Sequence, residues 1–238
     1  MDAVVDAIVL AGGKGTRLQS ILPDIPKPLA PINGEPFLDI LLEHLNRFSS
    51  IKKVILAVGY KAEMIMHRYL KSACYRFPIA FSEEKVLLGT GGGVKRALDL
   101  TDTSDVLVLN GDTFVEIDID TLLAFHRERS ASVTIVLREV EEAGRYGSIT
   151  IDGESRIIKF EEKVAQGKAH LINAGVYVID RKLLNTIDKD REISLERQLL
   201  PEWTKYNSYG FIVTGKFIDI GIPETYKKAS SYLERGCS

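Results

Sequence analysis

Apolar runs of strand length alternate with helical patterns through the first half of the chain. Residues 4–10, 53–58 and 105–109 are mostly apolar, which is typical of strands buried on both faces. Between them, residues 37–48 and 62–70 place apolar side chains at helical spacing. This alternation predicts an α/β fold with a doubly wound, mostly parallel sheet. In such folds, ligands bind beyond the carboxyl ends of the strands.

The second half of the chain has shorter strand patterns. We expect a helix over residues 118–129, strands over 132–137 and 171–179, and a hairpin of 146–151 with 156–160. We also expect a strand pair around Gly215, formed by residues 211–213 and 216–220, and a terminal helix over 223–233. These patterns predict a smaller antiparallel subregion attached to the main sheet. Because no linker or repeat divides the chain, we expect one domain over residues 1–238, with halves of about 1–115 and 116–238.

The composition narrows the class of protein. The chain has 238 residues, 45% of them hydrophobic, which is enough for one large core. A formal net charge of −2 predicts neither a nucleic-acid partner nor a role at a membrane surface. There is no basic leader and no apolar run of membrane-spanning length, and the two cysteines, Cys74 and Cys237, are far apart. We therefore expect a cytoplasmic protein.

A glycine-rich loop follows the first predicted strand. It reads LAGGKGTRL over residues 10–18, with Gly12, Gly13 and Gly15 close together. Glycine has no Cβ, so backbone N–H groups in such a loop can close on an anion. Arg17 adds a planar fork of donors that matches the geometry of phosphate. The loop therefore predicts a phosphate cradle.

A second cation comes shortly after the loop. Lys27 lies between Pro26 and Pro28, which stiffen the chain around it. A P-loop would need Ser or Thr after its lysine, whereas Gly15 follows Lys14. A dinucleotide-binding fingerprint would need a helix at once, which the prolines prevent. A triphosphate cradle and a tight turn with solvated charges are the remaining interpretations.

Two aspartates stand at the ends of apolar strand patterns. Asp112 follows Asn110 and Gly111, and Asp219 lies within residues 216–220. Asn-Gly-Asp is common in Asx turns, whereas carboxylates beside phosphate groups are typical ligands of Mg²⁺. Each aspartate alone is compatible with either interpretation.

Further short motifs follow in order along the chain. They are PKPLAP (26–31), GEP (34–36), AVGY (57–60), LGTGGG (88–93), RYG (145–147), FEEK (160–163) and FIDIGIP (217–223). Together with the loop at residues 10–18, they resemble the sugar-1-phosphate nucleotidylyltransferases over nearly the whole chain. The resemblance implies a Rossmann-like nucleotidyltransferase fold without the C-terminal β-helix of some members. It also implies that the first half of the chain binds nucleotide and the second half binds sugar phosphate.

The resemblance further implies a reaction. Members transfer a nucleoside monophosphate from a nucleoside triphosphate to a sugar 1-phosphate, with Mg²⁺ as cofactor. The motifs are most similar to the guanylyltransferases that use GTP and a heptose 1-phosphate to supply surface polysaccharides. Alternatives are a mannose 1-phosphate substrate, a uridylyl-, thymidylyl- or cytidylyltransferase, a catalytically silent nucleotide-sensing subunit and an NAD(P)-binding oxidoreductase. A homo-oligomer is compatible with all of these.

The resemblance assigns roles to particular positions. The catalytic residues would be Arg17, Lys27, Asp112 and Lys163, and the metal ligands would be Asp112 and Asp219. The nucleotide-binding residues would be Leu10, Gly12, Gly13, Gly15, Thr16, Glu84, Gly89 and Thr90. The residues that bind the sugar phosphate would be Asn110, Gly147, Glu161, Lys163 and Asn173.

Base recognition is expected at the second glycine-rich block, which we interpret as a turn followed by a helix over residues 94–100. Glu84 lies just before it, with Gly89 leaving room for the base, while Glu83 is an equally placed surface acid. An ionised carboxylate only accepts hydrogen bonds, so Glu84 suits the N1–H and 2-amino group of guanine. Val86 and Leu87 stand where relatives often have Glu-Pro, which alters the expected shape of this loop.

Overall fold

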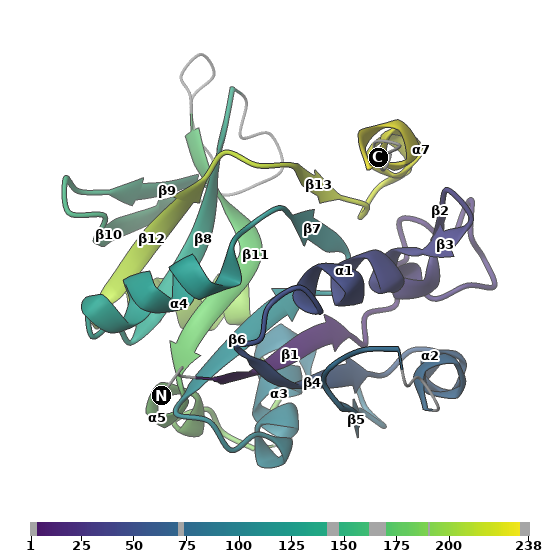
Figure 1. Ribbon diagram of the computed structural model, residues 1–238, viewed down its shortest axis with the longest axis horizontal. Coiled ribbons are helices and arrows are strands. Elements are labelled where there is room, and N and C mark those ends of the chain that lie inside the picture. The colour runs from purple at the N-terminus through teal and green to yellow at the C-terminus, as the bar shows by residue number, and fades with distance from the viewer. Residues whose placement is uncertain (1–3, 71–73, 142–147, 162–169, 190, 234–238) are drawn as a thin grey trace.

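The computed structural model describes residues 4–70, 74–141, 148–161, 170–189 and 191–233, with only the backbone of Glu161. Within these residues, nine strands form one mixed sheet in the order β10-β9-β11-β6-β1-β4-β5, and β8 pairs with both β11 and β12 (Figure 1). The strands are β1 (Val5–Ala11), β4 (Ile51–Val58), β5 (Ile79–Glu83), β6 (Asp105–Asn110), β8 (Val133–Val140), β9 (Ser148–Ile151), β10 (Ile157–Glu161), β11 (His170–Asp180) and β12 (Ser208–Val213).

Helices and two small ladders complete the described fold. The helices are η1 (Lys27–Leu29), α1 (Phe37–Leu45), α2 (Ala62–Tyr69), α3 (Gly89–Ala97), η2 (Leu98–Leu100), α4 (Ile119–Glu128), α5 (Arg181–Asn185), η3 (Leu195–Leu199), α6 (Leu200–Trp203) and α7 (Pro223–Tyr232). The short antiparallel ladders pair β2 (Pro31–Ile32) with β3 (Glu35–Pro36) and β7 (Thr113–Val115) with β13 (Phe217–Asp219).

The strands β6, β1, β4 and β5 run parallel, and helices cover both of their faces. Successive residues of a strand point to opposite faces. Val9 and Leu56 accordingly pack in the core shared with α1, α2 and α4, while Ile8 and Ile55 pack in the core shared with α3 and α5. Both faces of β1, β4 and β6 are buried, which explains why the sequence of these three strands is mostly apolar. The predicted doubly wound, mostly parallel sheet is confirmed.

The antiparallel subregion joins this sheet directly. β11 pairs antiparallel with β6, and it also carries β8 and β9. The expected hairpin is present as β9 and β10, and the Asp152 carboxylate accepts N–H bonds from Glu154 and Arg156 at its turn. The register of β11 against β8 shifts between Asn173 and Tyr177, which marks a bulge.

Two local predictions were wrong. The strands around Gly215 do not pair with each other, because β12 pairs parallel with β8 and β13 pairs with β7. These partners lie far back in the sequence, so a local pattern cannot identify them. The second glycine-rich block is not a turn before a helix at residues 94–100, since α3 already begins at Gly89.

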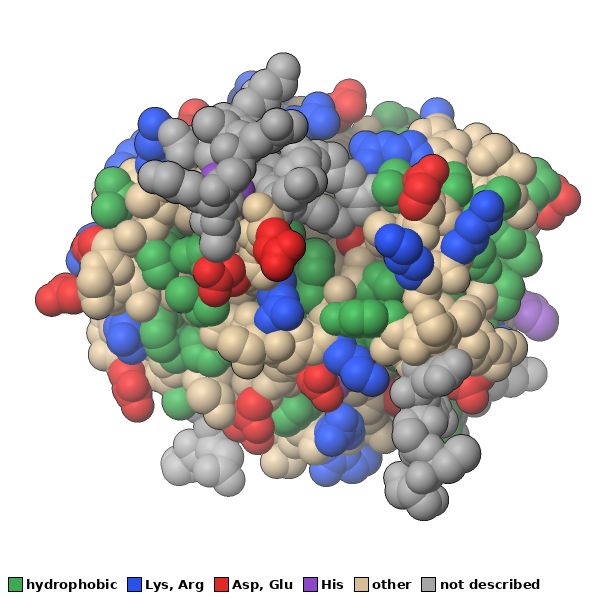
Figure 2. All heavy atoms as spheres, turned by 90° about the horizontal axis from the view of Figure 1, so that it is seen from above, with side chains coloured by type: hydrophobic (Ala, Val, Ile, Leu, Met, Phe, Trp, Pro, Cys, Tyr) green, Lys and Arg blue, Asp and Glu red, His purple; other side chains and the backbone are tan. Residues whose placement is uncertain are grey.

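The surface carries mixed charge. On the face in Figure 2, Lys and Arg side chains lie interspersed with Asp and Glu side chains. The formal net charge of −2 agrees with this balance. In the part of the chain that the structure describes, none of the helices combines the length and apolar character that a membrane span requires.

Candidate active site

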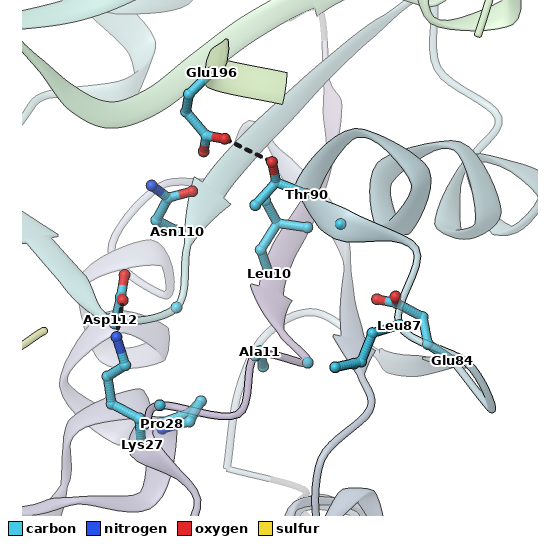
Figure 3. Close-up of a pocket in the computed structure, with 15 residues that line it drawn as sticks. Leu10, Ala11, Lys27, Pro28, Glu84, Leu87, Thr90, Asn110, Asp112 and Glu196 are labelled. Atoms are coloured by element: carbon cyan, nitrogen blue, oxygen red, sulfur yellow. Dashed lines mark hydrogen bonds and ion pairs between the residues drawn. The ribbon is translucent and has the colours of Figure 1, made fainter. Parts of the chain in front are cut away.

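A pocket of about 370 Å³ opens beyond the carboxyl ends of β1 and β6 (Figure 3). Its walls come from the glycine-rich loop, η1, the start of α3 and the segment after β6. Pockets of about 300–1,000 Å³ are typical of small-molecule sites. Parallel strands of an α/β sheet direct their carboxyl ends to one edge, so the fold itself places the pocket here.

Glu84 stands at one end of the pocket and is only 9% exposed. Its Oε2 accepts a hydrogen bond of 2.9 Å from the backbone N–H of Leu88. Its Oε1 lies so close to α3 that a Cβ on Gly93 would approach it to 2.8 Å. Burial raises the pKa of the Glu84 carboxyl above its ordinary value of 4.5. The Glu84 carboxylate therefore fits at this position because residue 93 of α3 is glycine.

The neighbouring acid has a different environment. Glu83 is exposed and lines a separate hollow with Arg96 and Lys189, so it does not share the pocket of Glu84. The loop that follows turns Leu87 into the pocket and leaves Val86 73% exposed. Apolar Leu87 thus forms part of the pocket wall beside Glu84 (Figure 3).

A second hollow of about 240 Å³ adjoins the other end of the pocket. The two share Gly15, Lys27 and Asp112, and the second is also lined by Thr16, Arg17 and Asp219. The Lys27 ammonium forms an ion pair with the Asp112 carboxylate (Figure 3). The structure therefore brings the predicted catalytic cations and both predicted metal ligands of the described chain to one place.

Backbone pairing explains why Asp112 and Asp219 meet. In the ladder of β7 and β13, Asp219 stands opposite Thr113, and the N–H of Ile220 donates to the carbonyl of Asp112 over 2.9 Å. Mg²⁺ commonly uses one or two carboxylates and takes its other ligands from phosphate oxygens and water. No cluster of three or more His, Cys, Asp or Glu side chains suited to a metal occurs within the described residues. Two carboxylates facing a phosphate-sized hollow fit Mg²⁺.

The bulge of β11 lies behind Asn110, since a Cβ on Gly175 would approach Asn110 Nδ2 to 2.8 Å. The side-chain amide of Asn173 donates to the Tyr177 hydroxyl over 2.8 Å and accepts from the N–H of Gly175 over 2.9 Å. Asn110 lines the pocket, and its buried Oδ1 has no hydrogen-bond partner within the described residues. Burial raises the pKa of Tyr177 well above its ordinary value, and the negative charges of Glu196 and Asp112 raise it further.

Three predicted sugar-phosphate residues have no described side chain. Gly147 and Lys163 lie outside the described residues, and Glu161 is described only as the last backbone position of β10. The remaining predicted nucleotide residues, Leu10, Gly12, Gly13, Gly89 and Thr90, all line the pocket.

Glu196 lines the pocket with a charged side chain that the sequence analysis does not single out. Its Oε2 accepts a hydrogen bond of 2.6 Å from the Thr90 hydroxyl (Figure 3). Glu196 lies on η3, a short helix whose N-cap is Ser194, and the Ser194 side chain accepts from the N–H of Arg197. The sequence pattern contains no signal that this helix meets α3, because the contact joins residues 106 positions apart.

Comparison with known proteins gives the family. The family model described as "Nucleotidyl transferase" matches residues 6–236. The chain belongs to the nucleotidyl transferase family. Among members of this family, a D-glycero-α-D-manno-heptose 1-phosphate guanylyltransferase from Campylobacter jejuni is 40% identical over 222 residues, covering 93% of this chain and 97% of the relative. The enzyme of that name from Aneurinibacillus thermoaerophilus is 38% identical over 231 residues, covering 97% and 99%.

A solved structure agrees with the family assignment. HddC from Yersinia pseudotuberculosis, crystallised in complex with GMP-PN, is 36% identical to this chain. It superposes with a TM-score of 0.85 and covers 97% of this chain and 100% of its own. The nucleotidyl transferase fold predicted from the motifs is therefore confirmed at the level of the whole described architecture.

Proposed function

We propose that this protein transfers GMP from GTP to D-glycero-α-D-manno-heptose 1-phosphate and releases pyrophosphate. Relatives with this name match the chain over nearly its full length. The observation that carries the proposal is the buried Glu84 carboxylate at one end of a pocket whose other end holds Lys27 and Asp112. In this arrangement the Glu84 end would bind the base and the Lys27 end would bind the phosphates.

Glu84 is the residue that we propose selects guanine over other bases. The N1–H and 2-amino group of guanine are two donors on one edge, and an ionised carboxylate can accept from both. Uracil and thymine present a single N–H between two carbonyl oxygens, at least one of which would face the carboxylate. We expect the base to lie against Leu87 and Gly89, with Leu10 beside the nucleoside.

The loop and its cations are the proposed phosphate site. Backbone N–H groups at Gly12, Gly13, Gly15 and Thr16 would surround the triphosphate. Arg17 would stabilise the departing pyrophosphate, and Lys27 would neutralise charge that develops on the α-phosphate. The Lys27 ammonium pairs with Asp112, and a phosphate oxygen of the nucleotide would offer it a second anionic partner.

The chemistry needs positioning more than proton transfer. An oxygen of the sugar phosphate attacks the α-phosphorus in line, and the new P–O bond forms as the bond to the β-phosphate oxygen breaks. The bonding electrons leave with pyrophosphate. Because the nucleophile is already an anion, no general base is required. Mg²⁺ held by Asp112 and Asp219 would neutralise charge on the phosphate oxygens of the two substrates.

The sugar phosphate is proposed to bind on the β11 side. Asn110 and Asn173 would contact sugar hydroxyls there, since an amide can donate and accept at once. By the family resemblance, Glu161 would contact further hydroxyls, Gly147 would offer its backbone and Lys163 would hold the phosphate. The first and second halves of the chain would thus divide nucleotide and sugar between them.

A panel of GTP, ATP, UTP, CTP and dTTP against heptose, mannose and glucose 1-phosphates tests this function. Pyrophosphate release gives the rate, and mass spectrometry identifies the nucleotide sugar. We expect the highest kcat/KM for GTP with the heptose 1-phosphate. A preference for mannose 1-phosphate would overturn the proposed sugar alone, whereas a preference for a pyrimidine nucleotide would overturn the role of Glu84. If none of the nucleotide and sugar 1-phosphate pairs gave pyrophosphate, nucleotide sensing would be the better interpretation.

A further inference from the structure

Glu196 is a pocket carboxylate for which the proposed reaction has no role. It comes from η3, and it faces the pocket on the side of Asn110, away from Glu84 (Figure 3). Of its two oxygens, Oε2 is directed at Thr90 and the other is turned toward the pocket (Figure 3). It is therefore placed to contact whatever occupies this corner.

The segment 191–199, here called the strap, is fixed to the start of α3. The N–H of Ile193 donates to the carbonyl of Leu88 over 2.8 Å, and the N–H of Gly91 donates to the carbonyl of Ile193 over 2.9 Å. Gly89 has φ +71°, and a Cβ there would lie 2.6 Å from the carbonyl oxygen of Ile193. The glycines of this block thus admit the strap, which in turn delivers Glu196.

Hydrogen bonds fix the orientation of the carboxylate. The Thr90 hydroxyl accepts the N–H of Leu195 over 2.8 Å and donates to Glu196 Oε2 over 2.6 Å. A hydroxyl has one hydrogen, so the direction of this chain of bonds is set. The Ser194 hydroxyl adds a second contact to Oε2 at 3.2 Å. Glu196 is consequently preorganised, with an acceptor oxygen facing the pocket.

The surroundings indicate which part of the substrates it meets. A carboxylate repels phosphate, so this corner suits neutral hydroxyl groups. Two neutral side chains lie near Glu196. Asn110 has a buried Oδ1 with no hydrogen-bond partner among the described residues, and Tyr177 is close enough for the charge of Glu196 to raise its pKa. Asn110 and Tyr177 lie at the junction of β6 and the β11 bulge, on the side proposed above for the sugar.

We infer that Glu196 accepts a hydrogen bond from a ring hydroxyl of the sugar 1-phosphate and is a specificity-determining residue for that substrate. The inference rests on the proposed function only in that the pocket takes a sugar 1-phosphate. Glu196 then recognises the sugar as Glu84 recognises the base, and the glycine-rich start of α3 positions both carboxylates.

Steady-state kinetics of Glu196→Gln test this role. Thr90 keeps its acceptor by turning the amide oxygen of glutamine toward itself, so the amide nitrogen faces the pocket and an acceptor becomes a donor. We expect KM for the sugar 1-phosphate to rise roughly tenfold to a hundredfold, the scale of a hydrogen bond to a charged group. KM for GTP should stay within roughly twofold, as should both constants in Glu192→Gln, an exposed control on the same strap.

Deoxy analogues identify the group that is contacted. A monodeoxy sugar 1-phosphate that lacks the contacted hydroxyl should be a poor substrate of the wild type and should lose nothing more in Glu196→Gln. If instead Glu196→Gln raises KM for GTP and no longer discriminates against 2′-deoxy-GTP or 3′-deoxy-GTP, the residue binds ribose and the inference is wrong. Unchanged KM values for both substrates would also overturn it.

Further controls distinguish a loss of sugar recognition from misfolding and from a failure of the proposed function. The melting temperature of each variant checks the fold, and Thr90→Val, which removes the orienting hydroxyl while Glu196 remains, should raise KM for the sugar in the same direction. The wild-type panel chooses the sugar 1-phosphate used, so failure with the heptose substrate alone affects only the proposed function. If nothing turns over, calorimetric binding of mannose 1-phosphate replaces KM, and equal affinity for wild type and Glu196→Gln would contradict the inference.

Discussion

The proposed base end and the proposed sugar end of the pocket each present a carboxylate, and the chain positions the two in different ways. Glu84 is held by the N–H of Leu88, four residues away, and is nearly buried. Glu196 is held by the hydroxyl of Thr90, 106 residues away, and is only partly buried. One carboxylate is fixed by its own loop and the other by a long-range contact. Both depend on α3, which passes between them (Figure 3).

This difference explains which residue the sequence could reveal. Glu84 lies next to a recognisable glycine-rich motif, so a role for it can be predicted from the sequence even though that motif is the start of α3 and not a turn. Glu196 becomes visible only once the strap is docked on α3. One glycine-rich motif thus positions two pocket carboxylates, of which only the one fixed by a local contact could be predicted from the sequence.

The largest effect is expected between the two ends, where both substrates must meet. Asp112→Ala removes a proposed metal ligand and the partner of Lys27. We expect kcat to fall by on the order of 10²–10³, as when one electrostatic stabiliser of a transition state is lost. Asp120→Asn, an exposed change on α4, is the control and should leave kcat unchanged. Near-normal turnover of Asp112→Ala at millimolar Mg²⁺ would remove Asp112 from the mechanism.

The start of α3 supports both ends of the pocket, and a substitution at Gly89 should disturb it. Gly89→Ala places a Cβ against Ile193 and forces a left-handed backbone on alanine. We expect a loss of roughly 1–3 kcal/mol in the free energy of unfolding. For a chain of this size, each kcal/mol lowers Tm by about 2–4 °C. Gly153→Ala, with nothing within 4 Å of its Cβ, should leave Tm unchanged, and equal melting of both variants would argue against the tight docking of the strap.

A smaller, pH-dependent effect should separate the base end from the sugar end. Burial raises the pKa of Glu84, so this carboxyl takes up a proton at a higher pH than an ordinary glutamate. As pH falls through that raised pKa, KM for GTP should rise because a protonated carboxyl no longer accepts from both guanine donors. Glu84→Gln should flatten this part of the pH profile, while Glu83→Gln should retain it. A profile for GTP that is identical in wild type and Glu84→Gln would contradict the assignment.

The same pKa shift makes a prediction for stability. A carboxyl whose folded pKa is raised costs stability at pH values above that pKa, where burial of the charged form is unfavourable. Glu84→Gln should therefore melt no lower than the wild type at neutral pH, by differential scanning calorimetry. A marked drop in Tm would mean that the carboxylate has a structural role beyond its bond to Leu88.

Much of the fold was predictable because its parallel half is locally encoded. The apolar runs at β1, β4 and β6 report burial on two faces, and the spacing in α1 and α2 reports helices. The partners of β12 and β13 were not predictable, because they lie far back in the sequence. Val213 of β12 pairs with Arg138, 75 positions earlier, and Phe217 of β13 pairs with Val115, 102 positions earlier. The start of α3 was missed because glycine has poor helix propensity, and here the docked strap outweighs it.

At the proposed phosphate end, the sequence motifs predicted which side chains of the described chain come together. Arg17, Lys27, Asp112 and Asp219 line one hollow, as their motifs suggested. The proposed sugar end was less predictable, because its geometry depends on the β11 bulge and on the strap rather than on a contiguous motif. The functional roles of all the site residues stay predictions, and so do the positions of Gly147, of Lys163 and of the Glu161 side chain.

The most direct test of the account is the discrimination between GTP and ITP by wild type and Glu84→Ala. ITP keeps N1–H and lacks only the 2-amino group. If Glu84 accepts from that group, wild type should prefer GTP by about 1.5–3 kcal/mol, or roughly tenfold to a hundredfold in kcat/KM. In Glu84→Ala the two nucleotides should become nearly equal, while Glu196→Gln should keep the wild-type ratio. Equal use of GTP and ITP by the wild type, or an undiminished preference in Glu84→Ala, would contradict the claim that Glu84 reads guanine.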